Sequence, residues 1–178
     1  LWMMDNYEVE SVTGSVFEKL GHLEEATQGN MFGPWDPKTY EVEDSAFGFI
    51  KMKNGASIFL ESAWAINMRQ SIEAATTLCG TKAGAEIIGG MSKAQGEYDL
   101  IFNKTSHGQL TEESLSAGGS IAFFEGGSDK PEDIECKQWM EAILNDGEPL
   151  VKPEQAFMVT KILDNIYKSS TEGKEIRF

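Results

Sequence analysis

The alternation of apolar and polar positions over residues 41–67 predicts a β-hairpin. Asn54-Gly55 separates two β-rich runs, and this dipeptide favours a two-residue type I′ turn because both central residues need positive φ. Such a turn pairs Phe49 with Leu60. The predicted register places large apolar side chains on both faces: Phe47, Phe49, Ile58, Leu60 and Trp64 on one, and Ile50, Met52 and Phe59 on the other.

An apolar surface on both faces of this hairpin requires two covering layers. Antiparallel sheets ordinarily leave one face in water, which gives a polar face. We therefore expect the chain's own helices on one face and a second chain or a second domain on the other. The alternative is a sheet enclosed within the domain, which the small number of predicted helices disfavours.

The rest of the chain adds further strands and two helices. Strands are predicted at 9–20, 70–79 and 85–88, and a second hairpin joins 98–104 to 109–115. Apolar residues at helical spacing follow Pro131 and Pro153, each a residue suited to the first turn of a helix. Gly147 and Gly173 stop these helices, and residues 176–178 form a short edge strand. The predicted class is α+β: an open, mostly antiparallel sheet with helices on one face.

Composition narrows the class of protein. The chain has 178 residues with a net charge of −14, which argues against nucleic acids and anionic membranes as partners, since both require basic patches. No apolar run approaches the roughly 20 residues of a membrane span. We expect Cys79 and Cys136 to be buried free thiols of a cytoplasmic protein, although two cysteines also allow one bridge. The apolar residues 1–4 are typical of the last turn of a helix, so we expect a piece of a longer protein.

A search for an autonomous active site identifies no catalytic residue. No set of His, Cys, Asp or Glu has the spacing of metal ligands. We expect His22 and His107 to be exposed polar residues rather than bases. Glu43 and Asp44 precede a strand, where carboxylates usually face solvent.

Four residues form a candidate binding site. Trp64 and Asn67 follow the hairpin, Arg69 lies just beyond, and Trp35 in a long loop could fold back towards them. An aromatic ring, an amide and a guanidinium group around a cavity mouth suit a polyhydroxylated ligand such as a sugar. The alternatives are that Trp35 and Trp64 pack in the core or an interface, and that Arg69 forms a surface ion pair.

Several segments together resemble a known family. They are Val-Glu-Asp-Ser-Ala-Phe-Gly at 42–48, Lys-Asn-Gly-Ala at 53–56, Leu-Glu-Ser-Ala-Trp-Ala at 60–65 and Leu-Cys-Gly-Thr-Lys-Ala-Gly at 78–84. Glu-Pro-Leu-Val at 148–151 and Gly-Lys-Glu-Ile at 173–176 extend the match. The order and spacing of these segments resemble the C-terminal domain of the Gfo/Idh/MocA oxidoreductases, relatives of glucose–fructose oxidoreductase and inositol dehydrogenase. The resemblance covers nearly the whole of 1–178, as a single domain.

The resemblance implies a parent enzyme with an N-terminal Rossmann domain that binds NAD or NADP. That parent would be a dehydrogenase that transfers hydride between the cofactor and a sugar or cyclitol. This domain would contribute pocket walls, through Trp64 and Asn67, and would make homo-oligomer contacts through the open sheet face. The family's nucleotide-binding glycine motif, its Glu-Lys-Pro lysine and its Asp-x-x-x-His pair do not occur here. By the resemblance, the 178 residues alone would bind no cofactor and would be inactive.

Two other functions fit the sequence. The chain could be a non-enzymatic assembly module that oligomerises through its sheet, which the two apolar faces support without reference to any family. It could also be a carbohydrate-binding domain, an interpretation that depends only on Trp35, Trp64 and the polar groups near them.

Overall fold

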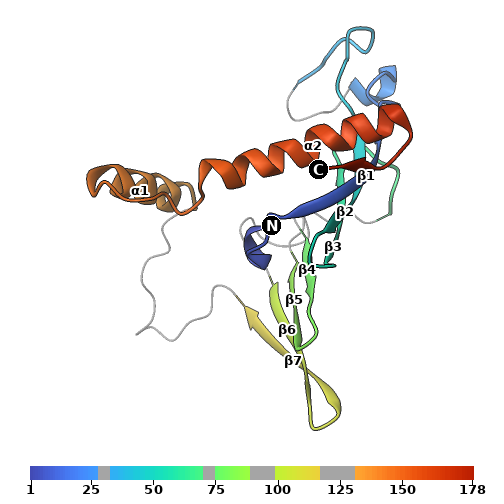
Figure 1. Ribbon diagram of the computed structural model, residues 1–178. Helices are drawn as coiled ribbons and strands as arrows, with labels where there is room; N and C mark the ends of the chain where they lie inside the picture. Colours follow the sequence, from blue (N-terminus) through green and yellow to red (C-terminus); the bar gives the residue numbers. More distant parts are fainter. Residues whose placement is uncertain (28–32, 70–74, 89–98, 117–130) are drawn as a thin grey trace. The chain divides into compact units, whose positions relative to one another are not determined.

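The computed structural model describes residues 1–27, 33–69, 75–88, 99–116 and 131–178. Within these ranges the chain forms two α-helices, eight β-strands and two short 3-10 helices (Figure 1). Contacts divide it into two compact units, one of Leu1–Asn67 with Glu132–Phe178 and the other of Met68–Pro131. The predicted α+β class is confirmed.

Each unit contains one four-stranded antiparallel sheet, so the described strands form two sheets rather than the single sheet that the sequence predicted. The first sheet has the order β3-β2-β1-β8, and the second has the order β4-β5-β6-β7. Residues 70–74 and 98 of the predicted strands lie outside the described residues. The strands are β1 (Val9–Phe17), β2 (Ser45–Met52), β3 (Ser57–Ala63), β4 (Thr76–Cys79), β5 (Ala83–Ile88), β6 (Asp99–Ser106), β7 (Gln109–Ser116) and β8 (Ile176–Arg177).

The helices begin and end close to where the sequence predicted. The α-helices are α1 (Pro131–Leu144) and α2 (Pro153–Glu172), and the 3-10 helices are η1 (Trp2–Met4) and η2 (Glu24–Thr27). Gly173 caps α2 in the left-handed conformation, with φ of 64°, and its N–H donates to the Ser169 carbonyl at 2.8 Å. Neither α-helix in the described part of the chain has the length and apolar character of a membrane span.

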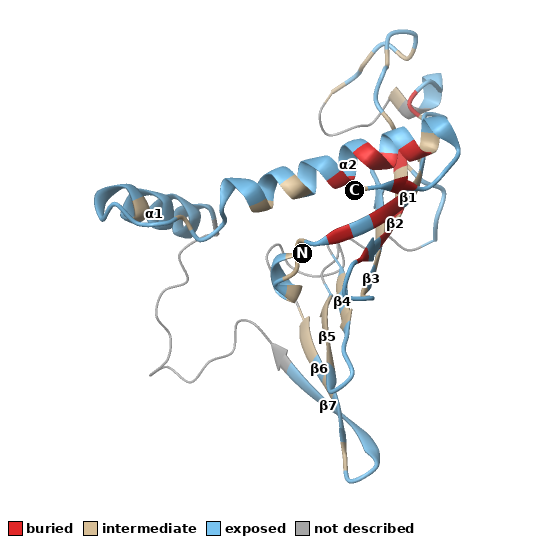
Figure 2. Cartoon of the chain, viewed as in Figure 1, coloured by how far each residue is buried: buried red, intermediate tan, exposed pale blue. Residues whose placement is uncertain are grey.

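The buried core lies between α2 and the first sheet. Figure 2 shows the buried residues on β1, β2 and the part of α2 that crosses them. Among the described residues, the buried apolar ones are Val9, Val12, Ile50, Met52, Ile162, Ile166 and Ile176. A bulge between Val9 and Ser11 shifts the alternation of β1, so Val9 and Val12 both contribute to this core. Apolar burial on one face of the sheet is therefore what holds α2 in place.

Two glycines of the first sheet leave room for Ile166 of α2. Gly14 on β1 pairs with Gly48 on β2, and Ile166 of α2 lies over both. A Cβ on Gly14 would stand 2.7 Å from Ile166 Cγ2, and a Cβ on Gly48 would stand 2.7 Å from Ile166 Cδ1. Real Cβ atoms do not approach other carbons so closely, so the glycines set how near α2 can lie to the sheet.

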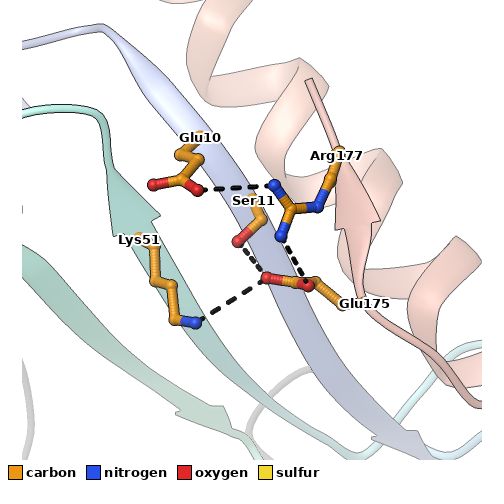
Figure 3. Close-up of polar contacts among 5 residues, drawn as sticks. All are labelled: Glu10, Ser11, Lys51, Glu175 and Arg177. Carbon is orange, nitrogen blue, oxygen red and sulfur yellow. Dashed lines mark hydrogen bonds and ion pairs between the residues drawn. The ribbon is translucent and has the colours of Figure 1, made fainter.

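A polar network on the other face of the same sheet joins the C-terminal strand β8 to β1 and β2 (Figure 3). The buried Ser11 hydroxyl donates to Glu175, whose carboxylate also lies 3.8 Å from Lys51 Nζ and 3.5 Å from Arg177. Arg177 in turn lies 3.5 Å from Glu10. The Ser11 hydrogen bond, with the charges of Arg177 and Lys51, lowers the pKa of Glu175 despite partial desolvation. The ionised carboxylate therefore links β8 to β1 and β2.

The first hairpin differs from its predicted register by one residue. Phe49 pairs with Phe59 rather than with Leu60, and the connection has three residues, Lys53 to Gly55. Only Gly55 has positive φ, at 91°, and the Gly55 N–H donates to the Met52 carbonyl at 2.9 Å. Asn54 instead uses its side-chain oxygen to accept the Ala56 N–H at 3.0 Å. A one-residue slip exchanges the faces of every β3 side chain, so Phe59 lies with Phe47 and Phe49.

The predicted second hairpin is confirmed and contains the two-residue turn expected at the first. His107 and Gly108 both have positive φ, 53° and 77°, between β6 and β7. No residue of the second unit whose burial is described falls in the buried class. Cys79 there and Cys136 on α1 are free, as expected, but both are exposed, so the prediction of buried thiols is wrong.

Candidate functional site

Three aromatic rings meet beside one end of the first sheet. Trp35 and Tyr40 come from the segment before β2, and Trp64 follows β3 directly. Ring centroids are 5.4 Å apart for Trp35 and Trp64, 5.5 Å for Trp35 and Tyr40, and 5.7 Å for Tyr40 and Trp64. The two indoles are nearly perpendicular, at 85°. We call Trp35, Tyr40 and Trp64 the aromatic cluster.

The indole N–H groups of the cluster are already bonded to the main chain. Trp35 Nε1 donates to the Gly21 carbonyl at 2.9 Å, and Trp64 Nε1 donates to the Glu43 carbonyl at 2.8 Å. The ring surfaces are therefore what the cluster can offer to a ligand. Trp64 is 49% exposed, whereas Trp35 and Tyr40 are partly buried. An accessible indole face beside polar main chain suits stacking against the C–H face of a sugar ring.

Two consecutive acids beneath the cluster have different surroundings. Asp44 is 2% exposed, and its carboxylate accepts backbone N–H groups of Lys19, Leu20 and Gly21. Burial alone would raise the pKa of Asp44, but these hydrogen bonds, with one from Ser45, lower it below its ordinary value. The expectation that Asp44 faces solvent is thus wrong, because three unpaired main-chain donors at the end of β1 need an acceptor.

The partly exposed carboxylate of Glu43 accepts a hydrogen bond from the Tyr167 hydroxyl of α2. This bond, together with desolvation and the charges of Glu43 and Glu18, raises the pKa of Tyr167 to about 12. Desolvation, followed by the charges of Asp44 and Glu43, also raises the pKa of Tyr40. Both phenols therefore remain protonated near neutral pH and do not act as bases.

The structure brings together two of the four residues predicted for the site. Trp35 and Trp64 are in ring contact, as the predicted fold-back of the loop requires. Asn67 is exposed and makes no side-chain hydrogen bond with any other described residue. Arg69 is exposed and belongs to the second unit. Sequence reasoning missed Tyr40 and Asp44, and no local pattern marked Asp44, because the main-chain donors to its carboxylate come from residues 19–21.

Acid–base and metal chemistry have few candidates in the described part of the chain. His22 is exposed, with Nδ1 3.0 Å from the Pro37 carbonyl oxygen, and its ring contacts Tyr40 edge-on. His107 lies exposed in the β6–β7 turn. No group of three or more His, Cys, Asp or Glu among the described residues could hold a metal ion.

The face of the first sheet opposite α2 carries a row of phenylalanines. We call Phe17, Phe47, Phe49 and Phe59 the open face. Phe17 and Phe47 pack edge-on with centroids 6.1 Å apart, and Phe49 and Phe59 lie 5.0 Å apart. Phe59 is 78% exposed and Phe17 is 41% exposed. An exposed aromatic patch of this kind marks a contact surface more often than a solvated one.

A separate hollow lies at the C-terminal end of α1. Its volume is about 280 Å³, and it contains none of the four predicted site residues. Its only charged group is Asp146. The lining residues are Trp139, Ala142, Ile143, Asp146, Gly147 and Pro149.

Family models, curated relatives and solved structures all match this chain with oxidoreductases. The family model described as "Oxidoreductase family, C-terminal alpha/beta domain" matches residues 1–178. D-glucoside 3-dehydrogenase of Escherichia coli K12 is 28% identical over 172 residues, which cover 94% of this chain and 42% of the relative.

Solved structures share the fold at lower identity. Aldose-aldose oxidoreductase from Caulobacter crescentus, complexed with glycerol, has a TM-score of 0.65 at 18% identity and covers 96% of this chain and 42% of its own. Levoglucosan dehydrogenase, complexed with NADH and levoglucosan, has a TM-score of 0.66 at 16% identity and covers 96% and 45%. The chain therefore spans less than half the length of these relatives.

Proposed function

This chain belongs to the Gfo/Idh/MocA oxidoreductases as their C-terminal α/β domain, and from that premise we propose that it serves a longer, nicotinamide-dependent sugar dehydrogenase. The longer protein would carry an N-terminal Rossmann domain that binds NAD or NADP and supplies the catalytic groups. It would move hydride between that cofactor and a sugar or cyclitol. The observation that carries this proposal is the match of the family model over all 178 residues.

The named relatives support a sugar as the substrate. One is a glucoside dehydrogenase, and a structural neighbour was solved with NADH and levoglucosan. In this chain the aromatic cluster would form part of the pocket wall, with Asn67 of the same unit as a further polar contact. An indole face that stacks on a pyranose excludes water from the reacting ring and orients it, while hydride chemistry belongs to the cofactor.

The test is steady-state kinetics of the longer protein with NAD or NADP and a panel of glucosides and cyclitols. Trp64→Ala should raise KM roughly 2- to 10-fold, since one aromatic contact contributes about 0.5–1.5 kcal/mol. Trp139→Ala removes an indole of similar exposure, 57% against 49%, from α1 and serves as the control. An unchanged KM for Trp64→Ala, with the protein folded, would remove the cluster from the substrate pocket.

A second proposed role is self-association through the open face. Phe47, Phe49 and Phe59 lie on the side of the sheet that α2 does not cover. This role alone, without enzymatic activity, is the alternative function.

Light scattering over a dilution series distinguishes a monomeric chain from a self-associated one. Phe59→Ser should shift the mass towards the monomer, because Phe59 is the most exposed ring of the open face. Leu110→Ser on β7 is the matched control, since Leu110 is 76% exposed and lies in the other unit. A monomeric wild-type chain at every concentration would contradict the association.

A further inference from the structure

Asp44 joins the ends of three strands through its main chain and side chain. Its N–H donates to the Phe17 carbonyl at 2.9 Å, at the end of β1. Its carbonyl accepts the N–H groups of Trp64 at 3.1 Å and Ala65 at 3.5 Å, just after β3. Its carboxylate accepts from Lys19, Leu20 and Gly21. The same residue therefore fixes Trp64 directly and fixes the chain that follows β1.

The carboxylate is compensated by main-chain donors rather than by a cation. Oδ2 accepts the three consecutive N–H groups, and Oδ1 lies 3.3 Å from the Ser45 hydroxyl that donates to it. No ion pair of Asp44 with a described lysine or arginine is present. Three convergent N–H dipoles stabilise an anion well, and each would be left without a partner if the carboxylate were removed.

Gly21 transmits this restraint to the other two rings of the aromatic cluster. Its N–H points at Asp44 Oδ2 at 3.4 Å, and its carbonyl accepts the Trp35 indole N–H at 2.9 Å. The Tyr40 ring lies directly over its Cα, because a Cβ there would stand 2.4 Å from Tyr40 Cε1. A shift of residues 19–21 would therefore move Trp35 and Tyr40 with respect to Trp64.

We propose that Asp44 is a positioning residue that sets the relative orientation of Trp35 and Trp64. It acts from both sides: through its carbonyl on Trp64, and through its carboxylate and Gly21 on Trp35. The value of this orientation for ligand binding rests on the proposed function, in which the exposed face of Trp64 stacks on the sugar. The orientation itself is a property of the chain without ligand and can be measured alone.

The readout is the exciton couplet that two closely packed, nearly perpendicular indoles produce in circular dichroism. Trp2→Phe and Trp139→Phe remove the two other indoles, both of which are exposed, and leave the pair of interest. In this background Asp44→Ala should abolish the couplet while the signal of α2 persists. Asp44→Asn should retain it, because the amide oxygen replaces Oδ2 and the amide nitrogen can donate to Ser45.

Asp36→Asn is the matched control, since it removes the same charge from the segment that carries Trp35. Asp36 is exposed, and its carboxylate accepts the Lys38 N–H at 2.9 Å. The couplet should be unchanged in this variant. A couplet that survives in folded Asp44→Ala would overturn the proposal, because a residue that only stabilises the fold lowers the unfolding midpoint and leaves the indole geometry of the folded molecules intact.

A second variant keeps the test informative if Asp44→Ala does not fold. Gly21→Ala leaves the Asp44 carboxylate in place but forces Tyr40 and the chain at residue 21 apart. The couplet should be reduced, and an unchanged couplet would show that Gly21 does not connect Asp44 to Trp35. These outcomes are independent of substrate. Loss of the couplet in Asp44→Ala, together with an unchanged KM in Trp64→Ala, would reject the substrate role of the aromatic cluster and keep the positioning role of Asp44.

Discussion

The close contact of Ile166 with Gly14 and Gly48 leads to a prediction that distinguishes two atoms of the Ile166 side chain. A methyl group added at Gly48 would collide with Cδ1 of Ile166 at 2.7 Å and with Cγ1 at 3.3 Å. A methyl group added at Gly14 would collide with Cγ2 at 2.7 Å and with Cβ at 3.2 Å. Ile166→Val deletes Cδ1 and keeps Cγ2. It should therefore relieve the first collision and leave the second.

The magnitudes follow from core packing. Ile166→Val should lower the free energy of unfolding by about 0.5–1.5 kcal/mol, and Gly48→Ala by about 1–3 kcal/mol. The double variant Gly48→Ala/Ile166→Val should lose less than the sum, with a coupling of about 0.5–1 kcal/mol or more. Gly14→Ala/Ile166→Val should lose the sum or more, since the Gly14 methyl group also meets the Phe47 carbonyl oxygen at 3.1 Å.

Urea unfolding followed by far-ultraviolet circular dichroism measures these energies. Equal m-values across the set are needed, because a changed m-value would mean that the unfolded or native state itself had changed. The same coupling energy in both double variants would show that Cδ1 of Ile166 is not what opposes a methyl group at Gly48. Unchanged stability in both Gly48→Ala and Gly14→Ala would also contradict the prediction, since α2 could then move away from the sheet without cost.

Three further predictions concern the ends of the chain and its acids. Ser169→Ala should cost about 1–3 kcal/mol in urea unfolding, because the buried hydroxyl accepts the Gly14 N–H at 3.0 Å and donates to the Lys174 carbonyl at 2.7 Å. Gly173→Ala should cost about 1 kcal/mol by the same assay, since its φ of 64° is unfavourable for a residue with a Cβ. Folded-state pKa values below the ordinary ones for Asp44 and Glu175 mean that stability is lost as pH falls through the lowered values. The thermal unfolding midpoint should therefore fall less steeply with decreasing pH in Glu175→Gln than in the wild-type chain. The same pH dependence in both proteins would contradict this prediction.

Local rules predicted the helices well because the determinants lie within each segment. Pro131 and Pro153 sit at first helical positions, and Gly173 provides the left-handed end. The same rules did not predict which stripe is buried. On α2 only the part that crosses β1 and β2 is covered, and on α1 Trp139 and Leu144 are exposed. Burial depends on partners that a helical period does not contain.

The hairpin register failed for an identifiable reason. Lys53-Asn54-Gly55 fits a three-residue loop with a left-handed glycine as well as it fits a two-residue type I′ turn. The structure uses the first, with Asn54 bonding to Ala56. The inference of two apolar faces survived the slip because Ile58 and Phe59 are both large and apolar, so either register gives each face an apolar β3 side chain.

The sequence allowed the aromatic residues of the site to be predicted, but not the residue that holds them in place. Trp35 and Trp64 stood out as large rings near one end of a hairpin. Asp44 did not, because its burial depends on donors 23–25 residues earlier in the chain. Such a contact forms only when β1 and β2 pair, which no local pattern around residue 44 encodes.

We propose that this domain serves an enzyme that moves hydride from a sugar carbon to a nicotinamide cofactor. The most direct measurement is mass spectrometry of the reduced cofactor after turnover of the longer protein with a glucoside deuterated at carbon 3, the position named in its glucoside dehydrogenase relative. If the substrate of the longer protein reacts at that carbon, the cofactor gains one deuterium. A reduced cofactor without deuterium from any deuterated sugar or cyclitol position, or no reduction at all, would contradict the account.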